Sequence, residues 1–131
     1  MTRPAGYSGK PLPVKLGIKE SSRVLVSGAP AGFELGHPHH RRAGGEPYDV
    51  VLMFCPTLSR LRAGWPAAVR RTAVDGGLWV AWPKKASGVP TDLTENVVRE
   101  HALAAGLVDV KVCAVDEVWS GLKLVRRLAD R

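Results

Sequence analysis

Three short apolar runs, each closed by Gly or Pro, predict the strands of a buried sheet. They cover residues 23–27, 48–55 and 78–82, and none is long enough for a helix. Because these runs are apolar at most successive positions, both faces of the strands should be covered, as in a parallel sheet between helices. The pattern therefore predicts an α/β fold in which the three strands run side by side in one direction.

Helical spacing connects the second run to the third. Apolar residues recur on one helical face over residues 58–72, but Pro66 lacks an amide proton and should interrupt this face after Trp65. We therefore expect two short helices, with Pro66 opening the second. The pair Gly76-Gly77 should then turn the chain into the third strand.

A further helix should follow the third strand. Apolar positions repeat at helical spacing over residues 93–104, and Gly106 marks the expected end. Asp92 stands three residues before Glu95 and is the expected cap with its reciprocal acid, while Thr91 is the other candidate for the cap.

The last part of the chain predicts an antiparallel hairpin. Residues 108–115 and 122–127 both resemble strands, and the connection between them is too short for a crossover helix. Together, these elements predict a three-layer, Rossmann-like, mostly parallel sheet of about five strands that ends in this hairpin.

Length and composition fit a single domain over residues 1–131, with 45% hydrophobic residues for one core. Residues 1–10 are rich in Gly, Pro and Ser and predict a flexible or docked arm, followed by a short helix over residues 11–16 that Gly17 ends. No apolar segment is long enough to cross a bilayer and the start lacks a secretion signal. We therefore expect a cytoplasmic protein without membrane contact.

The chain is basic, with a net charge of +7 from 19 basic and 12 acidic residues. Basic pairs such as Arg70-Arg71 and Lys84-Lys85 are spread along the chain rather than gathered on one helix. This distribution favours a solvated basic surface over specific nucleic-acid binding, which stays an alternative.

Histidines and cysteines raise the question of a metal site. His37, His39 and His40 lie in a loop rich in Pro and Gly, without the carboxylate or thiolate partners that metal sites use. We therefore predict a solvated loop and no metal, and leave the role of these histidines open. Cys55 and Cys113 lie in apolar runs, which is typical of reduced, buried thiols.

The loops that follow the three apolar runs form the predicted site, because open parallel sheets bind ligands beyond the carboxyl ends of their strands. Lys84 and Lys85 are expected to hold an anion, and Trp82 to stack on a flat group. Capping and turn formation are the alternative explanation for the polar residues that follow. The predicted ligand-binding residues are Gly28, Gly32, Trp82, Lys84, Lys85, Ser87, Thr91 and Asp92.

No catalytic residue is predicted, since the chain shows no nucleophile beside a base and no phosphate loop. Asp116, Glu117 and Trp119 invite an acid-base hypothesis, although adjacent acids in a turn are usually exposed. The polar residues within 7–10 are expected to form a lid over the site or to contact a partner.

Three blocks of the sequence resemble an uncharacterised bacterial family of small proteins, a domain of unknown function. They are YSGKPLPVKLGI at 7–18, WPKKASGVPTDLTENVVRE at 82–100 and GLVDVKVCAVDEVWSGLKLVRR at 106–127. The resemblance covers nearly the whole chain and implies no activity.

The order of elements also resembles a shortened class I S-adenosylmethionine-dependent methyltransferase. By this resemblance, residues 23–32 would be the first strand and glycine loop, and residues 48–56 and 76–82 the fourth and fifth strands. Residues 108–127 would be the terminal hairpin. The resemblance implies S-adenosylmethionine as the cofactor.

Two departures from the methyltransferase pattern argue against that cofactor. Val26 and Pro30 replace an acid and a second glycine of the loop, although Gly28 and Gly32 are retained. Residues 33–47 are too few for two further strands, one of which would carry the acid that holds the ribose.

The sequence therefore predicts a non-catalytic binding or regulatory module. Its expected ligand is an anionic small molecule or a protein partner at the carboxyl edge of the sheet. A methyltransferase with a reduced pocket and a weak nucleic-acid binder are the alternatives, and self-association stays open.

Overall fold

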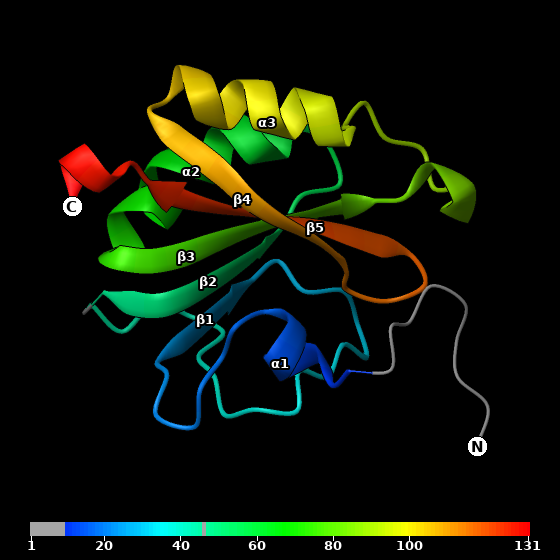
Figure 1. The fold of residues 1–131 in the computed structure, drawn as a ribbon. Helices are drawn as coiled ribbons and strands as arrows, with labels where there is room; N and C mark the ends of the chain where they lie inside the picture. Colours follow the sequence, from blue (N-terminus) through cyan, green and yellow to red (C-terminus); the bar gives the residue numbers. More distant parts are fainter. Residues whose placement is uncertain (1–9, 46) are drawn as a thin grey trace.

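The computed structural model describes residues 10–45 and 47–131, so most of the predicted N-terminal arm lies outside the described residues. The described chain forms one five-stranded sheet in the order β1-β2-β3-β5-β4 (Figure 1). The strands are β1 (Val24–Ser27), β2 (Tyr48–Phe54), β3 (Thr72–Pro83), β4 (Leu107–Ala114) and β5 (Trp119–Arg126).

The directions of the strands confirm the central part of the predicted fold. β1, β2 and β3 are parallel neighbours. β5 runs antiparallel to both β3 and β4, so β4 and β5 form the predicted hairpin. The sheet is mixed, because parallel and antiparallel pairs are equally frequent in it, and the expectation of a mostly parallel sheet was too narrow.

Helices lie on both faces of the sheet. Two helices, α2 (Leu58–Arg71) and α3 (Glu95–Ala104), cover one face, and the short α1 (Leu12–Lys15) lies on the other (Figure 1). Two single-turn 3-10 helices complete the described elements, η1 (Lys85–Ser87) and η2 (Leu128–Asp130). None of the described helices combines the length and apolar character needed to cross a membrane.

Alternation along β3 divides the core between the two faces. Leu78, Val80 and Trp82 pack toward α2 and α3, whereas Trp79 and Ala81 pack toward α1. Trp79 is fully buried, and its Nε1 donates a hydrogen bond to the carbonyl of Leu16 at 3.0 Å. This bond ties the end of α1 to the centre of the sheet.

The expectation of two short helices over residues 58–72 was wrong, because α2 continues through Pro66. Pro66 is exposed, whereas Leu61, Trp65 and Ala68 are buried on the face of α2 that contacts the core. Proline in a helix interior costs about 3 kcal/mol. Burial of one continuous apolar stripe along α2 offsets that cost.

The glycine pair lies within a strand and does not form the predicted turn before it. β3 starts at Thr72, which pairs with Tyr48, and the next pair along the strands is Val50 with Gly77. A bulge at residues 73–76 therefore separates the two halves of β3. Glycine suits this place because a Cβ at Gly77 would lie only 2.6 Å from Cε of Lys123.

The predicted cap of α3 was also wrong. α3 starts at Glu95, and its cap is Thr94, whose Oγ1 accepts a hydrogen bond from the amide of Val97 at 3.2 Å. Asp92 instead accepts a hydrogen bond from the amide of Leu58, the first residue of α2, at 2.8 Å. The acid therefore stabilises the start of a different helix, a contact that short-range spacing cannot reveal.

Candidate functional site

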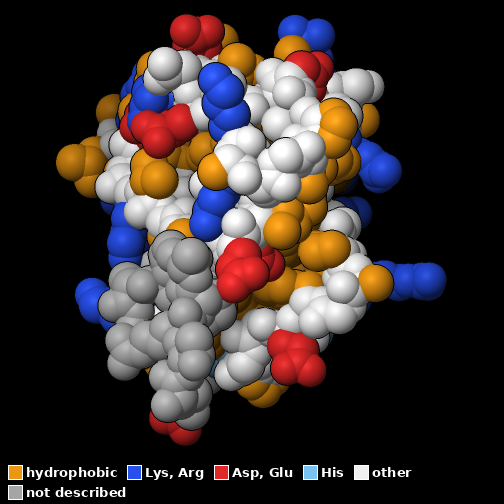
Figure 2. All heavy atoms as spheres, turned by 90° about the vertical axis from the view of Figure 1, so that its right-hand side faces the viewer, with side chains coloured by type: hydrophobic (Ala, Val, Ile, Leu, Met, Phe, Trp, Pro, Cys, Tyr) orange, Lys and Arg blue, Asp and Glu red, His pale blue; other side chains and the backbone are white. Residues whose placement is uncertain are grey.

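The parallel strands end at one edge of the sheet, which we call the carboxyl edge. Figure 2 shows the molecule from this side, with hydrophobic side chains exposed between scattered charged ones. Gly28 follows β1 with a φ of +70°, and a Cβ there would lie 3.1 Å from the carbonyl oxygen of Phe54. Glycine thus lets the chain turn closely past the end of β2.

Lys84 follows β3 directly and is fixed by the hairpin. Its amide donates a hydrogen bond to the carbonyl of Val118 at 2.7 Å. Asp116 shapes that turn, because its Oδ1 accepts hydrogen bonds from the amides of Val118 and Trp119, both at 2.8 Å. The Asp116 carboxylate therefore has a structural role at the turn, while Glu117 is exposed.

The charges of three lysines act on the half-buried thiol of Cys113 on β4. Burial raises the pKa of this thiol, and the nearby cations of Lys15, Lys111 and Lys84 oppose the shift. Lys15 is buried, with 5% of its surface exposed, and its carbonyl accepts a hydrogen bond from Nζ of Lys111 at 3.1 Å. We call Lys15, Lys84 and Lys111 the lysine cluster.

The partly exposed tryptophan next to Lys84 is Trp119 and not the predicted Trp82. Trp82 retains only 5% of its exposure and lies in the core beneath α2 and α3, so its ring cannot stack on a ligand at the surface. Trp119 pairs with Pro83 across the strands and is half-buried. Its ring meets Phe54 edge to face, with 5.0 Å between centroids.

The polar residues of the loop after β3 make contacts within the fold. Ser87 Oγ donates to the carbonyl of Lys84 at 2.6 Å and accepts from the amide of Val89. Thr91 Oγ1 donates to the carbonyl of Pro56 at 2.7 Å. Thr91 and Asp92 thus join this loop to the loop that precedes α2. The Lys85 residue is exposed, and its carbonyl accepts a hydrogen bond from the amide of Gly88 at 3.3 Å.

The predicted glycines lie in the turn that follows β1. Gly28 lines a cavity of about 240 Å³ together with Phe54, Arg60 and Gly64, and neither Lys84 nor Lys85 lines it. Gly32 is exposed and has a φ of +81°. Phe54 of this cavity contacts Trp119, which pairs with Pro83, the residue before Lys84.

The histidine loop is held by hydrogen bonds to oxygen atoms of the chain. Tyr48 Oη accepts a hydrogen bond from the amide of Gly44 at 2.7 Å and lies 2.6 Å from Nδ1 of His40. Nε2 of His37 lies 3.2 Å from the carbonyl oxygen of Ser22, and Nδ1 of His39 lies 2.7 Å from that of His37. Within residues 10–45 and 47–131, no group of three or more metal-binding side chains comes together.

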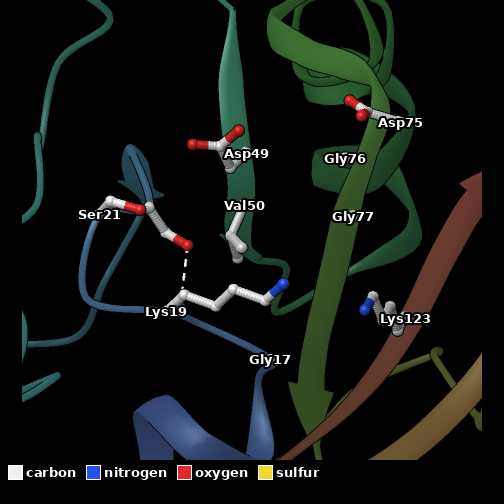
Figure 3. A pocket seen from close by; sticks show the side chains of 10 residues that line it. Gly17, Lys19, Ser21, Asp49, Val50, Asp75, Gly76, Gly77 and Lys123 are labelled. Atoms are coloured by element: carbon white, nitrogen blue, oxygen red, sulfur yellow. Dashed lines mark hydrogen bonds between the residues drawn. The ribbon is translucent and has the colours of Figure 1, made fainter.

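A second cavity, of about 350 Å³, lies at the opposite edge of the sheet, where β2 and β3 begin (Figure 3). Its lining includes Lys19, Asp49, Asp75, Gly76, Gly77 and Lys123. No local pattern predicts this cavity, because its residues come from four separate segments. The Gly76-Gly77 pair was the one local signal, and it was interpreted as a turn.

No protein-family model matches the chain, and no curated protein is significantly similar to it. The resemblance of the three sequence blocks to a bacterial family therefore stays a prediction, and the functional conclusion depends on the geometry.

Proposed function

We propose that the protein is a non-catalytic binding module that holds an anionic small molecule at the carboxyl edge, beside Lys84. The observation that carries the proposal is the position of Lys84, which directly follows β3 and whose amide is fixed to the carbonyl of Val118 at 2.7 Å. Lys111, whose Nζ donates to the carbonyl of Lys15 at 3.1 Å, adds a second positive charge on the neighbouring strands. Like charges held near one another repel, and a bound anion relieves that repulsion.

Two of these lysines are not neutralised by a neighbouring acid. Among the described residues, no carboxylate lies within ion-pair distance of Lys84 or Lys111, and the ion pairs found there join Arg99 to Glu95 and Asp109. Ammonium groups are compact charges that bind phosphate and carboxylate well. Lys85, exposed one residue further on, adds to the positive potential.

Trp119 favours an anion that also carries a flat ring. Its half-buried indole lies on the strand pair next to Lys84, and aromatic faces stack readily on nucleobases. We therefore put nucleotides first among the candidate ligands. Of the eight predicted ligand-binding residues, Lys84 and Lys85 are the direct contacts in this proposal, and Ser87, Thr91 and Asp92 shape the loop that presents them.

We also propose that the fold is a degenerate form of the class I methyltransferase fold. Three adjacent parallel strands followed by an antiparallel hairpin agree with the shortened order expected from that resemblance. Between β1 and β2, the described residues form no further strand, and His40 makes only an isolated bridge with Leu25. The strand that would carry a ribose-binding acid has no counterpart there, which supports binding without methyl transfer.

Isothermal titration calorimetry with ATP and pyrophosphate at physiological salt tests the proposal. Lys84→Gln should weaken ATP binding about tenfold, because a charge-assisted contact contributes about 1.5–3 kcal/mol. Arg127→Gln is the matched control, since it removes one exposed positive charge far along the chain from this cluster. Equal affinities of the two variants, or no ATP binding by the wild type, would contradict the proposal.

The alternatives give different results in the same experiment. S-adenosylmethionine binding tighter than ATP would favour a methyltransferase with a reduced pocket. Retention of DNA or RNA that falls steeply with salt, without measurable ATP binding, would favour the nucleic-acid alternative.

A further inference from the structure

The cavity at the opposite edge is lined by charges of both signs. It lies between the turn at residues 19–22, the start of β2 and the bulge of β3 (Figure 3). The ammonium groups of Lys19 and Lys123 point into one part of it, and the carboxylates of Asp49 and Asp75 lie around the other part. Its volume of about 350 Å³ falls within the range of small-molecule sites.

These opposite charges do not neutralise one another. In the described part of the chain, neither lysine comes within 4.0 Å of a carboxylate, and the ion pairs found there belong to Arg99. No ion pair between described residues therefore neutralises these four charges, and a ligand with matching charges could do so.

The fold holds the charged groups in place. The stem of Lys123 lies directly on Gly77, where a Cβ would approach its Cε to 2.6 Å. Oδ2 of Asp49 accepts a hydrogen bond from the amide of Arg23 at 2.7 Å. The turn that carries Lys19 is closed by two hydrogen bonds with Ser22, both at 2.9 Å. Little side-chain freedom would therefore be lost on binding, at least for Lys123 and Asp49.

We propose that this cavity binds a small zwitterion. Its anionic group, a carboxylate or a phosphate, lies between Lys19 and Lys123, and its ammonium group faces Asp49 and Asp75. A simple anion would meet the repulsion of two carboxylates, and a simple cation that of two ammonium groups, so a ligand with both charges is favoured over either. Gly76 and Gly77 offer a wall without side chains, which allows the ligand to approach the backbone.

A series of ω-amino acids measures the spacing of the two subsites. Glycine, β-alanine, 4-aminobutyrate, 5-aminopentanoate and 6-aminohexanoate carry the same two charges at increasing separation, and butyrate and butylammonium carry one charge each. In ¹⁵N-¹H NMR titrations of the whole chain, one chain length should bind best, with shifts at residues 17–22 and 75–77. Both singly charged compounds should bind about tenfold more weakly or less, since each lacks one charge-assisted contact.

Two substitutions connect this binding to the named charges. Lys123→Met retains the stem that covers Gly77 and removes the charge, and Asp75→Asn removes an exposed carboxylate. Each should weaken binding of the best ω-amino acid about tenfold, whereas Arg127→Gln should not change it. Dispersed amide spectra verify that each variant is folded.

Three results would overturn the proposal. They are equal affinity for butyrate and 4-aminobutyrate, the same dissociation constant for Lys123→Met and Arg127→Gln, and no saturable shift with any member of the series. Lys111 of the lysine cluster pairs with Lys123 across β4 and β5, so the two proposals are separated by residues at opposite ends of β3. Lys84→Gln should weaken ATP binding alone, and Asp75→Asn should weaken ω-amino acid binding alone.

Discussion

Removal of the Asp92 carboxylate should destabilise α2, a helix that starts more than thirty residues earlier in the chain. Oδ1 of Asp92 accepts the hydrogen bond of the Leu58 amide at 2.8 Å, across a sequence separation of 34 residues. Thr57 is the N-cap of α2 and accepts from the amide of Arg60 at 3.2 Å, so Asp92 supplies a second acceptor at this helix start. Loss of one hydrogen bond costs about 0.5–1.5 kcal/mol, and loss of a negative charge at a helix start costs about 0.3–1 kcal/mol. Since the site is exposed, we expect Asp92→Ala to lower the free energy of unfolding by about 1.5 kcal/mol.

The corresponding change in melting temperature is large enough to measure. At about 2.1 cal/mol/K per residue, the 131 residues give an unfolding entropy of about 0.28 kcal/mol/K. A loss of about 1.5 kcal/mol should therefore lower the melting temperature by about 5 °C. Asp92→Asn keeps an acceptor oxygen and should lose only the charge contribution, about a third of the effect.

Urea unfolding followed by circular dichroism is the assay, with Glu100→Ala as the control. Glu100 is an exposed acid of α3, so this variant loses a similar charge without losing an acceptor at a helix start. If Asp92→Ala and Glu100→Ala have the same urea midpoint, Asp92 does not stabilise α2. The predicted contact between Asp92 and a ligand would then be the better explanation.

Three further predictions concern groups elsewhere in the molecule. Burial lowers the pKa of His101, so the unfolded chain binds a proton more readily. The free energy of unfolding should then fall as the pH drops below about 6.5, and less so in His101→Gln, as urea titrations at pH 5 and pH 8 would show. Gly77→Ala should displace Lys123, whose Cε would lie 2.6 Å from the new Cβ, and NMR titration should show ω-amino acid binding weakened about tenfold. Burial raises the pKa of the Cys55 thiol to about 12, so mass spectrometry after disulfide-exchange labelling at pH 8 should find the half-buried Cys113 modified well before Cys55.

Those parts of the fold that depend on local apolar patterning could be predicted from the sequence. Short runs closed by Gly or Pro correctly indicated β1, β2 and the core of β3, and the short connection near Asp116 correctly indicated the hairpin. Pro66 wrongly predicted a helix break. The free-energy cost of proline in the helix was smaller than the gain from burying one continuous apolar stripe of α2. Local signals therefore fail where packing against a distant segment decides the outcome.

The sites were harder to predict because they depend on pairings between distant segments. Lys111 contacts the carbonyl of Lys15 across a separation of 96 residues, which no spacing in the sequence encodes. Trp79 and Trp82 lie in the same apolar run of the sequence. The structure shows that their side chains are buried on opposite faces of the sheet. At the predicted edge of the sheet, the partly exposed aromatic residue is therefore Trp119, which pairs with Pro83, and not the buried Trp82.

The most direct test of anion binding at the lysine cluster is an NMR map of amide shifts during titration with ATP. Binding as proposed shifts the amides of residues 84–88, 111–113 and 118–119 in a saturable way and leaves residues 75–77 unchanged. Saturable shifts confined to residues away from the carboxyl edge, or none at millimolar ATP, would contradict the proposed function.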